Sequence, residues 1–456
     1  MMRLRAALEP FASPRAFPIA LGVGLALRLA LLWLLAHVPL VADAKSYHEM
    51  GVAIARGESF EPYYPPGLSL LQAPLCALLG AGELVARAEM IGCWLAASFL
   101  LRGCTRALAG ERAANLAVTC FALYPTSIWL SVEPLTQVPA AACLLAIAWL
   151  APALAERPRL LPSLGLGLAT AELALIRPSS LPFLVAVPSY LLLRSAGARS
   201  ALLVTAIALL PVGAWLARAH AMTGRWVPIN DANALNLFYG NNPYTPLYKT
   251  WWFGSHAAGE PGVPREFTEL AERIAAEPPA LRERSYRDEA LAHIRARPDL
   301  FALRTANRVR AFFALDWSTG GWLRVYGLAP TSAALAVTAV EALFYLSIAA
   351  AVILSAVAPP AAGPARARLW EMAGASLLYA APYFVAFSHP TYHFPVVALG
   401  IAAAAAFAER VGSESHGGPL AALRASRPRR VAALLALLAL ALVQVEWLAM
   451  NLDKIG

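Results

Sequence analysis

The stretch of sequence that decides the fold class is FPIALGVGLALRLALLWLLAHV, from Phe17 to Val38. It is nearly free of charge and is as long as the roughly 20 apolar residues that a transmembrane helix needs. Arg3, Arg5 and Arg15 precede it, and no small-residue cleavage site follows it. We therefore interpret the stretch as a retained first membrane helix and not as a signal peptide.

The composition of the chain agrees with a membrane protein. Of its 456 residues, 59% are hydrophobic and 14% are charged, whereas soluble domains average about 45–50% and about 25%. The net charge of +9 does not indicate nucleic-acid binding, because the arginines lie in short clusters between apolar runs. We expect an all-α polytopic protein with about eleven spans, at approximately 17–38, 84–104, 112–130, 135–155, 160–176, 179–194, 200–219, 330–356, 367–387, 392–409 and 430–450.

Basic residues alternate across these predicted spans. If the N-terminus is cytoplasmic, every predicted cytoplasmic loop contains arginine, namely Arg102, Arg106, Arg112, Arg157, Arg159, Arg194, Arg199, Arg366, Arg368, Arg410, Arg424, Arg427, Arg429 and Arg430. This is the positive-inside pattern of multi-pass membrane proteins. We therefore expect a bacterial cytoplasmic (inner) membrane protein whose other loops face the periplasm.

Two predicted outer segments are too long to be simple turns. We divide the chain into an N-terminal transmembrane module at 1–219 with a first outer loop at 39–83, an outer-face segment at 220–328, and C-terminal transmembrane helices at 329–456. The first outer loop is expected to hold two short interfacial helices, one after Asp43 and one after its Pro-Pro pair. The outer-face segment is expected to become a charged helix from about residue 265 to 297.

Two carboxylates lie in different predicted outer loops. Asp43, in ADAKSY, is either the N-cap of the following helix or a catalytic base in a pocket at the outer surface. Glu133, in SVEPL, is either an acid of the first helical turn that suits the helix dipole or a partner of Asp43. Paired carboxylates can divide acid–base work, so the second interpretation requires the two to lie close together.

Basic and aromatic residues in other outer turns are candidates for binding. Arg177 lies where the positive-inside rule disfavours arginine, and is interpreted either as an anion-binding residue or as a lipid-headgroup contact. In SHPTYHFP, His389 and His393 are four residues apart, as metal-binding histidines on a helix can be. Pro390 argues against a regular helix there, so phosphate or sugar binding by this segment, with Tyr392, is favoured over metal binding.

The segment NLFYGNNP, residues 236–243, follows the seventh predicted span. Asparagine and glycine favour turns, so a structural loop is one interpretation, and substrate binding by Asn241 and Asn242 is the other. The aromatic residues at 251–253 are interpreted either as an interfacial belt or as a sugar-stacking surface.

Together these motifs resemble the GT-C superfamily of membrane glycosyltransferases, in particular the bacterial family-39-like enzymes related to protein O-mannosyltransferases and lipid A aminoarabinose transferases. The similar stretches follow in order along the chain: Asp43 with Tyr47, Tyr64-Pro-Pro-Gly67, Ser131-Val-Glu-Pro-Leu135, Arg177-Pro178, Gly240-Asn-Asn-Pro243, Glu289–Phe301 and Tyr392-His-Phe-Pro395. The chain departs from the family where Thr391 replaces the usual arginine before Tyr392. We expect His389 or His393 to supply the missing cation.

The resemblance implies a GT-C fold and transfer of a sugar, with inversion, from a polyprenyl-phosphate donor to an acceptor hydroxyl at the outer face. The acceptor is a glycolipid, a polysaccharide or a protein. No cofactor is expected to be required, although a divalent cation is compatible with the carboxylates, and no metal ligands are predicted. The implied roles are catalysis by Asp43 and Glu133, donor-phosphate binding by Arg177, Lys45, His389 and His393, and substrate binding by Tyr47, Tyr64, Asn241, Asn242 and Tyr392. The alternatives are a flippase or transporter, and a non-catalytic scaffold, for lipid-linked sugars.

Overall fold

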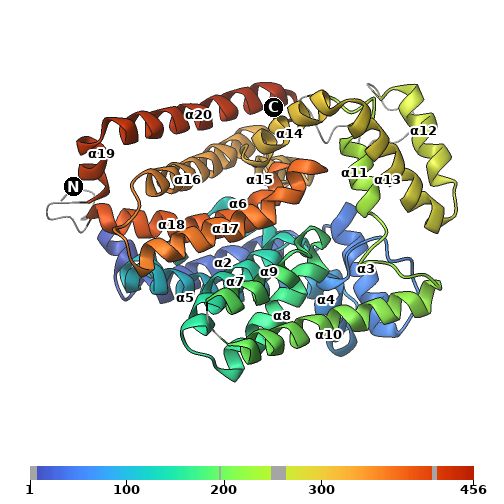
Figure 1. Ribbon diagram of the computed structural model, residues 1–456, viewed down its shortest axis with the longest axis horizontal. Helices are drawn as coiled ribbons and strands as arrows, with labels where there is room; N and C mark the ends of the chain where they lie inside the picture. The colour runs from blue at the N-terminus through green and yellow to red at the C-terminus, as the bar shows by residue number, and fades with distance from the viewer. Residues whose placement is uncertain (1–7, 195–196, 248–262, 413–417, 456) are drawn as a thin grey trace.

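The computed structural model describes residues 8–194, 197–247, 263–412 and 418–455 (Figure 1). Within these ranges every regular element is a helix, which confirms the prediction of an all-α protein. Figure 1 shows long helices that lie roughly along the longest axis, while the shorter helices α11, α12 and α13 gather with α3 at one end.

Seven helices of the described chain are long and apolar enough to cross a membrane. They are α2 (Ala16–Leu34), α5 (Glu83–Leu123), α7 (Gln137–Glu156), α10 (Ala198–Thr223), α16 (Thr331–Val357), η2 with α18 (Pro390–Gly412), and α20 (Arg427–Ile455). The shorter apolar helices are α4 (Gly67–Leu79), α8 (Leu160–Ile176) and α9 (Phe183–Leu193). The chain is therefore an α-helical polytopic membrane protein.

The predicted count of eleven spans is not confirmed. Two predicted spans, 84–104 and 112–130, meet within α5 at Gly110, whose φ of 86° and ψ of −178° kink the helix. Glycine suits this left-handed backbone because it has no Cβ. The predicted spans at 160–176 and 179–194 correspond to the short helices α8 and α9, and 367–387 corresponds to α17 (Pro364–Val385), which is not among the seven.

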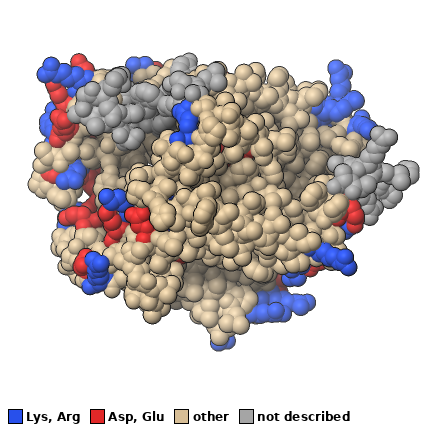
Figure 2. All heavy atoms as spheres, turned by 180° about the vertical axis from the view of Figure 1, so that it is seen from behind, with Lys and Arg blue, Asp and Glu red and all other residues tan. Residues whose placement is uncertain are grey.

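The distribution of charge on the surface agrees with a membrane-embedded belt. In the face shown in Figure 2, Lys, Arg, Asp and Glu lie mostly toward the ends of the molecule, and a broad band between them carries almost none. An uncharged band bounded by charged ends is the pattern expected of a chain that spans a bilayer.

The first spanning helix buries a charged side chain. Arg28 of α2 is 0% exposed, and its guanidinium lies 3.7 Å from the centroid of the Trp94 ring. It donates to the Gly24 and Ala122 carbonyls at 2.9 and 3.1 Å and to Ser127 Oγ at 2.9 Å. A buried charge is tolerated when such hydrogen bonds replace water, so Arg28 joins α2 to the end of α5 and to α6 (Pro125–Leu130).

The loop at 39–83, predicted to be the first outer loop, contains two helices, α3 (Ala42–Arg56) and α4 (Gly67–Leu79). The N-cap of α3 is Val41, with no side-chain cap, so the interpretation of Asp43 as the N-cap is wrong. Asp43 lies in the first turn of α3, and its side chain is therefore available for other contacts.

The outer-face segment forms α11 (Asn233–Gly240), α12 (Arg265–Ala275), α13 (Pro279–Ala296), α14 (Pro298–Phe312) and α15 (Ser318–Val325). The single charged helix predicted at 265–297 is instead two helices, because Pro278 and Pro279 interrupt it. A separate small core of Phe238, Phe267 and Tyr286 holds α11, α12 and α13 together.

Candidate active-site cavity

A cavity of about 660 Å³ lies where α3, the turn before α7, α15 and the 3-10 helix η2 (Pro390–His393) meet. Four of the predicted site residues line it, namely Asp43, Glu133, His389 and Tyr392. The volume is within the range of small-molecule sites in proteins, about 300–1,000 Å³. The two carboxylates, 90 positions apart by their numbering, therefore face one space.

Asp43 is held by a tyrosine of the YPPG stretch. Its Oδ1 accepts a hydrogen bond of 3.1 Å from the Tyr64 hydroxyl, and the Tyr64 ring packs edge-on against Tyr47 at 5.2 Å between centroids. Burial, and then the charge of Asp43, raise the pKa of Tyr64 to about 12. The hydroxyl therefore keeps its proton at neutral pH and can donate to the carboxylate continuously.

The glycine of the YPPG stretch allows a close helix contact. A Cβ on Gly67 would lie 2.6 Å from both Ile176 Cγ1 and Ile176 N, so no other residue fits without a shift. Ile176 ends α8 and directly precedes Arg177. This contact therefore sets the first outer loop against the turn that carries the predicted anion-binding arginine.

Glu133 is buried and paired. Its side chain is 4% exposed and forms an ion pair with Arg87 of α5, whose side chain is 1% exposed. Arg87 also donates to the Val38 carbonyl at 3.1 Å and to the Val132 carbonyl at 3.3 Å. Burial raises the pKa of Glu133, and the Arg87 charge opposes this rise. The pair fixes the carboxylate in the cavity wall.

Arg177 lies behind the Tyr392 ring, with its guanidinium carbon 5.1 Å from the ring centroid. Its Nε and Nη2 are buried and have no hydrogen-bond partner among the described residues. Among the described residues, no ion pair joins Arg177 to Glu172 of α8. Tyrosines supply the surroundings of this cation instead: Tyr47, Tyr379, Tyr383 and Tyr392.

The other predicted phosphate ligands are separated by the fold. Lys45 is exposed and lies 3.7 Å from Glu49 one helical turn along. His389 lines the cavity, and its Nδ1 accepts from the Thr391 backbone N–H at 3.2 Å. His393 is 2% exposed, stacks on Tyr345 at 4.9 Å, and donates through Nδ1 to a backbone carbonyl at 2.5 Å.

His393 faces a second cavity, of about 690 Å³, with a largely apolar lining from α14, α16, α17, α18 and α20. The turn at η2 thus divides the two spaces, with Tyr392 lining the first and His393 the second. The two histidines do not share a helix face, and the described residues contain no cluster of three His, Cys, Asp or Glu arranged to hold a metal.

Asn241 and Asn242 are used in internal contacts away from the cavity. The Asn241 amide donates to the carbonyls of Leu237 and Val385, each at 3.0 Å, and accepts from Arg308 at 3.0 Å. The Asn242 amide donates to a carbonyl of α11 at 2.9 Å. These bonds favour the structural-loop interpretation of the GNNP stretch. The aromatic residues at 251–253 lie outside the described residues.

Sequence reasoning missed the aromatic wall of the cavity. Trp129, Trp317, Trp322 and Tyr326 all line it, and Tyr326 lies 5.9 Å from Trp129 and 5.3 Å from Trp322 between ring centroids. Part of this wall could have been predicted from the run WSTGGWLRVY at residues 317–326, because its aromatic residues recur just before a predicted span. Arg87 was also detectable, because arginine at the outer end of a span breaks the positive-inside pattern.

Comparisons with known proteins found no matching family model, no matching curated protein and no matching solved structure. The resemblance to GT-C enzymes therefore rests on the order of the short motifs along the chain.

Proposed function

We propose that this chain is a membrane glycosyltransferase that moves a sugar from a polyprenyl-phosphate donor to an acceptor hydroxyl on the non-cytoplasmic face. The observation that carries the proposal is the cavity that Asp43 and Glu133 share with five tryptophan and tyrosine side chains. Such a lining suits a sugar, because a pyranose has an apolar C–H face that stacks on aromatic rings and hydroxyls that bond to carboxylates.

Asp43 is the proposed general base. The acceptor hydroxyl gives its proton to the free carboxylate oxygen, while the Tyr64 hydroxyl holds the other oxygen in place. The acceptor oxygen then forms a bond to the anomeric carbon, and the bond from that carbon to the phosphate oxygen breaks. The electron pair of the broken bond leaves with the polyprenyl phosphate, and attack from the opposite face inverts the anomeric centre.

Glu133 serves as a fixed acceptor of substrate hydrogen bonds and not as a second base. Its ion pair with Arg87 keeps the carboxylate in one position, and it lines the same cavity as the aromatic wall. A pre-positioned carboxylate of this kind orients the sugar hydroxyls without reorganising during the reaction.

Negative charge develops on the departing phosphate, and Arg177 is the proposed residue that stabilises it. Its guanidinium carbon lies 5.1 Å from the centroid of the Tyr392 ring, which lines the cavity, and two of its nitrogens make no hydrogen bond within the described chain. Rotation of that ring gives a phosphate access to the guanidinium fork, which suits bidentate binding. His389 lines the cavity and is the proposed second contact. Lys45 and His393 receive no role, because Lys45 is exposed beside Glu49 and His393 lines the apolar cavity.

The second cavity is the proposed site of the polyprenyl chain. It is bounded by the spanning helices α16, α18 and α20 together with α14 and α17, and is lined mainly by alanine, valine, leucine and isoleucine side chains. Adjacent residues of η2 line the two cavities, Tyr392 the polar one and His393 the apolar one. A donor whose apolar tail is joined directly to its sugar-phosphate head is therefore proposed to place one part in each cavity.

The proposal is tested by incubating membranes that contain the chain with radiolabelled polyprenyl-phosphate sugars, with and without chelator. Lipid and protein products are scored separately, so that the assay distinguishes glycolipid, polysaccharide and protein acceptors. We expect label to move to an acceptor in membranes with the chain and not in membranes without it. No transfer from any donor would contradict the proposal.

A transporter of lipid-linked sugars is the second candidate. The observation that favours it is charge buried in spanning helices, at Arg28 of α2 and at Glu341 of α16, each 0% exposed. Buried charges of this kind often mark translocation pathways. Proteoliposomes that move a labelled lipid-linked sugar across the bilayer without transferring it would favour this candidate.

A further inference from the structure

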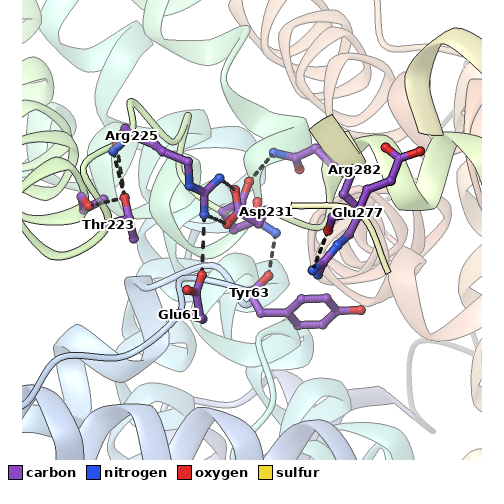
Figure 3. Close-up of polar contacts among 10 residues, drawn as sticks. Glu61, Tyr63, Thr223, Arg225, Asp231, Glu277 and Arg282 are labelled. Carbon is purple, nitrogen blue, oxygen red and sulfur yellow. Dashed lines mark hydrogen bonds and ion pairs between the residues drawn. The ribbon is translucent and has the colours of Figure 1, made fainter. Parts of the chain in front are cut away.

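A polar network joins the segment that follows α10 to the first outer loop (Figure 3). Arg225 contacts both carboxylate oxygens of Asp231, at 2.8 and 3.3 Å, and its Nη2 lies 3.5 Å from Glu61 Oε2. Figure 3 shows Arg225 and Asp231 facing the chain at Glu61 and Tyr63. We call residues 225–231 the clamp segment and residues 61–64 the tyrosine loop.

The clamp segment binds the backbone of the tyrosine loop at two consecutive residues. The Asp231 backbone N–H donates to the Pro62 carbonyl at 2.9 Å, and Asn230 Nδ2 donates to the Tyr63 carbonyl at 3.0 Å. Asn230 is 4% exposed, so its bond is protected from water. The next residue of the loop is Tyr64, whose hydroxyl holds Asp43. Three hydrogen bonds therefore connect the clamp segment to the proposed base.

Both ends of this connection carry backbone strain. Among the described residues other than glycine, only Ala42 and Ile229 have positive φ, of 49° and 76°. Ala42 directly precedes Asp43, and Ile229 directly precedes Asn230. Such conformations, particularly for a β-branched residue, persist only where the surroundings hold them, and they are concentrated at functional sites.

The strained residue of the clamp segment, Ile229, is anchored to α10. Ile229 is 1% exposed, and its carbonyl accepts from Trp215 Nε1 at 2.8 Å. Trp215 in turn stacks on Phe60, just before the tyrosine loop, with 6.2 Å between centroids. The bond from Trp215 thereby fixes Ile229 against α10, and the next residue, Asn230, donates to the Tyr63 carbonyl.

We propose that Asn230 is a positioning residue for Asp43, acting through Tyr64. Asn230 does not line the cavity. By fixing the Tyr63 carbonyl it sets the direction in which Tyr64 leaves the loop, and so the point at which the phenol meets Asp43 Oδ1. The inference rests on the proposed role of Asp43 as the base.

The kinetic test uses the full chain with Asn230→Ala, Tyr64→Phe and the double variant. Asn230→Ala is expected to lower kcat about 10- to 100-fold with little change in KM, since misplacing a catalytic group affects the chemical step. The matched control is Asn236→Ala on α11, an exposed asparagine that is expected to behave as the parent. In the Tyr64→Phe background, Asn230→Ala is expected to cause little further loss. Independent, multiplying losses would overturn the proposal.

Hydrogen exchange tests the clamp without relying on activity. In Asn230→Ala the amides of residues 57–66 are expected to exchange faster than in the parent and in Asn236→Ala, while the spanning helices are unchanged. Unchanged exchange at 57–66 would overturn the clamp. If no form of the chain transfers sugar, the proposed function fails, and the exchange result alone then decides whether Asn230 holds the loop.

Discussion

Replacement of Arg87 by alanine is predicted to be among the most destabilising single changes outside the apolar core. Both side chains of the Arg87–Glu133 pair are almost fully buried, at 1% and 4% exposed. Removing one partner of such a pair leaves an uncompensated charge and costs roughly 3–5 kcal/mol. The Val38 carbonyl loses its donor as well, so we expect a loss at the upper end of that range.

The pH dependence of this loss gives a second readout. Without Arg87, burial and then the negative charge of Glu83 act on Glu133, and both raise the pKa of its carboxyl. A carboxyl with a raised folded-state pKa stabilises the fold below its unfolded pKa, and that contribution is lost as pH rises through the folded value. Arg87→Ala is therefore predicted to be less destabilising at about pH 5 than at about pH 8, and adding Glu133→Gln is predicted to restore part of the stability.

The assay is thermal unfolding in detergent, followed by circular dichroism. The matched control is Arg106→Ala on the same helix, because Arg106 pairs with Glu111 at 3.3 Å where both side chains are about half exposed. Exposed pairs contribute about 0–1 kcal/mol, so the control is expected to unfold nearly as the parent does. If Arg87→Ala unfolded no earlier than Arg106→Ala at neutral pH, the account of the buried pair would be refuted.

Three further predictions concern Ala42, Glu283 and Arg177. Ala42→Gly is expected to raise the unfolding midpoint slightly, because relief of about 1–2 kcal/mol of left-handed strain exceeds the glycine entropy cost of about 0.5–1 kcal/mol; a lower midpoint would contradict this. Burial raises the pKa of Glu283 to about 7, so stability is expected to fall as pH rises from about 4.5 to 7, and calorimetry of Glu283→Gln should show a smaller fall. Arg177→Lys is expected to lower kcat/KM for the donor about 10- to 100-fold, because lysine lacks the bidentate fork, and unchanged steady-state kinetics would exclude phosphate binding by Arg177.

The membrane class and the position of Asp43 at a cavity could be predicted from local features of the sequence. Apolar length identifies membrane helices but neither their number nor their bounds, and the arginine pattern predicts which loops share a face. Asp43, Glu133 and His389 come from three predicted outer loops, and they line one cavity. Residues on one face of the membrane lie within a limited distance of one another, so this part of the site could be predicted from the sequence.

The remainder depends on tertiary contacts that no local pattern encodes. Whether Glu133 is free or paired depends on Arg87, a residue of another helix. Whether a histidine faces the polar or the apolar cavity depends on the direction of a single 3-10 turn, which separates His389 from His393. Asn241 looked like a binding residue, but its amide is occupied by backbone carbonyls, one of them at the end of α17.

The most direct test of the central claim is single-turnover sugar transfer by the parent chain and by Asp43→Asn, with circular dichroism to verify that both fold alike. Asparagine keeps the shape of the side chain and can still accept from Tyr64, but it cannot take the acceptor proton. The account predicts a loss of about 10²–10⁴-fold in the transfer rate. Transfer by Asp43→Asn at the parent's rate would show that Asp43 is not the base.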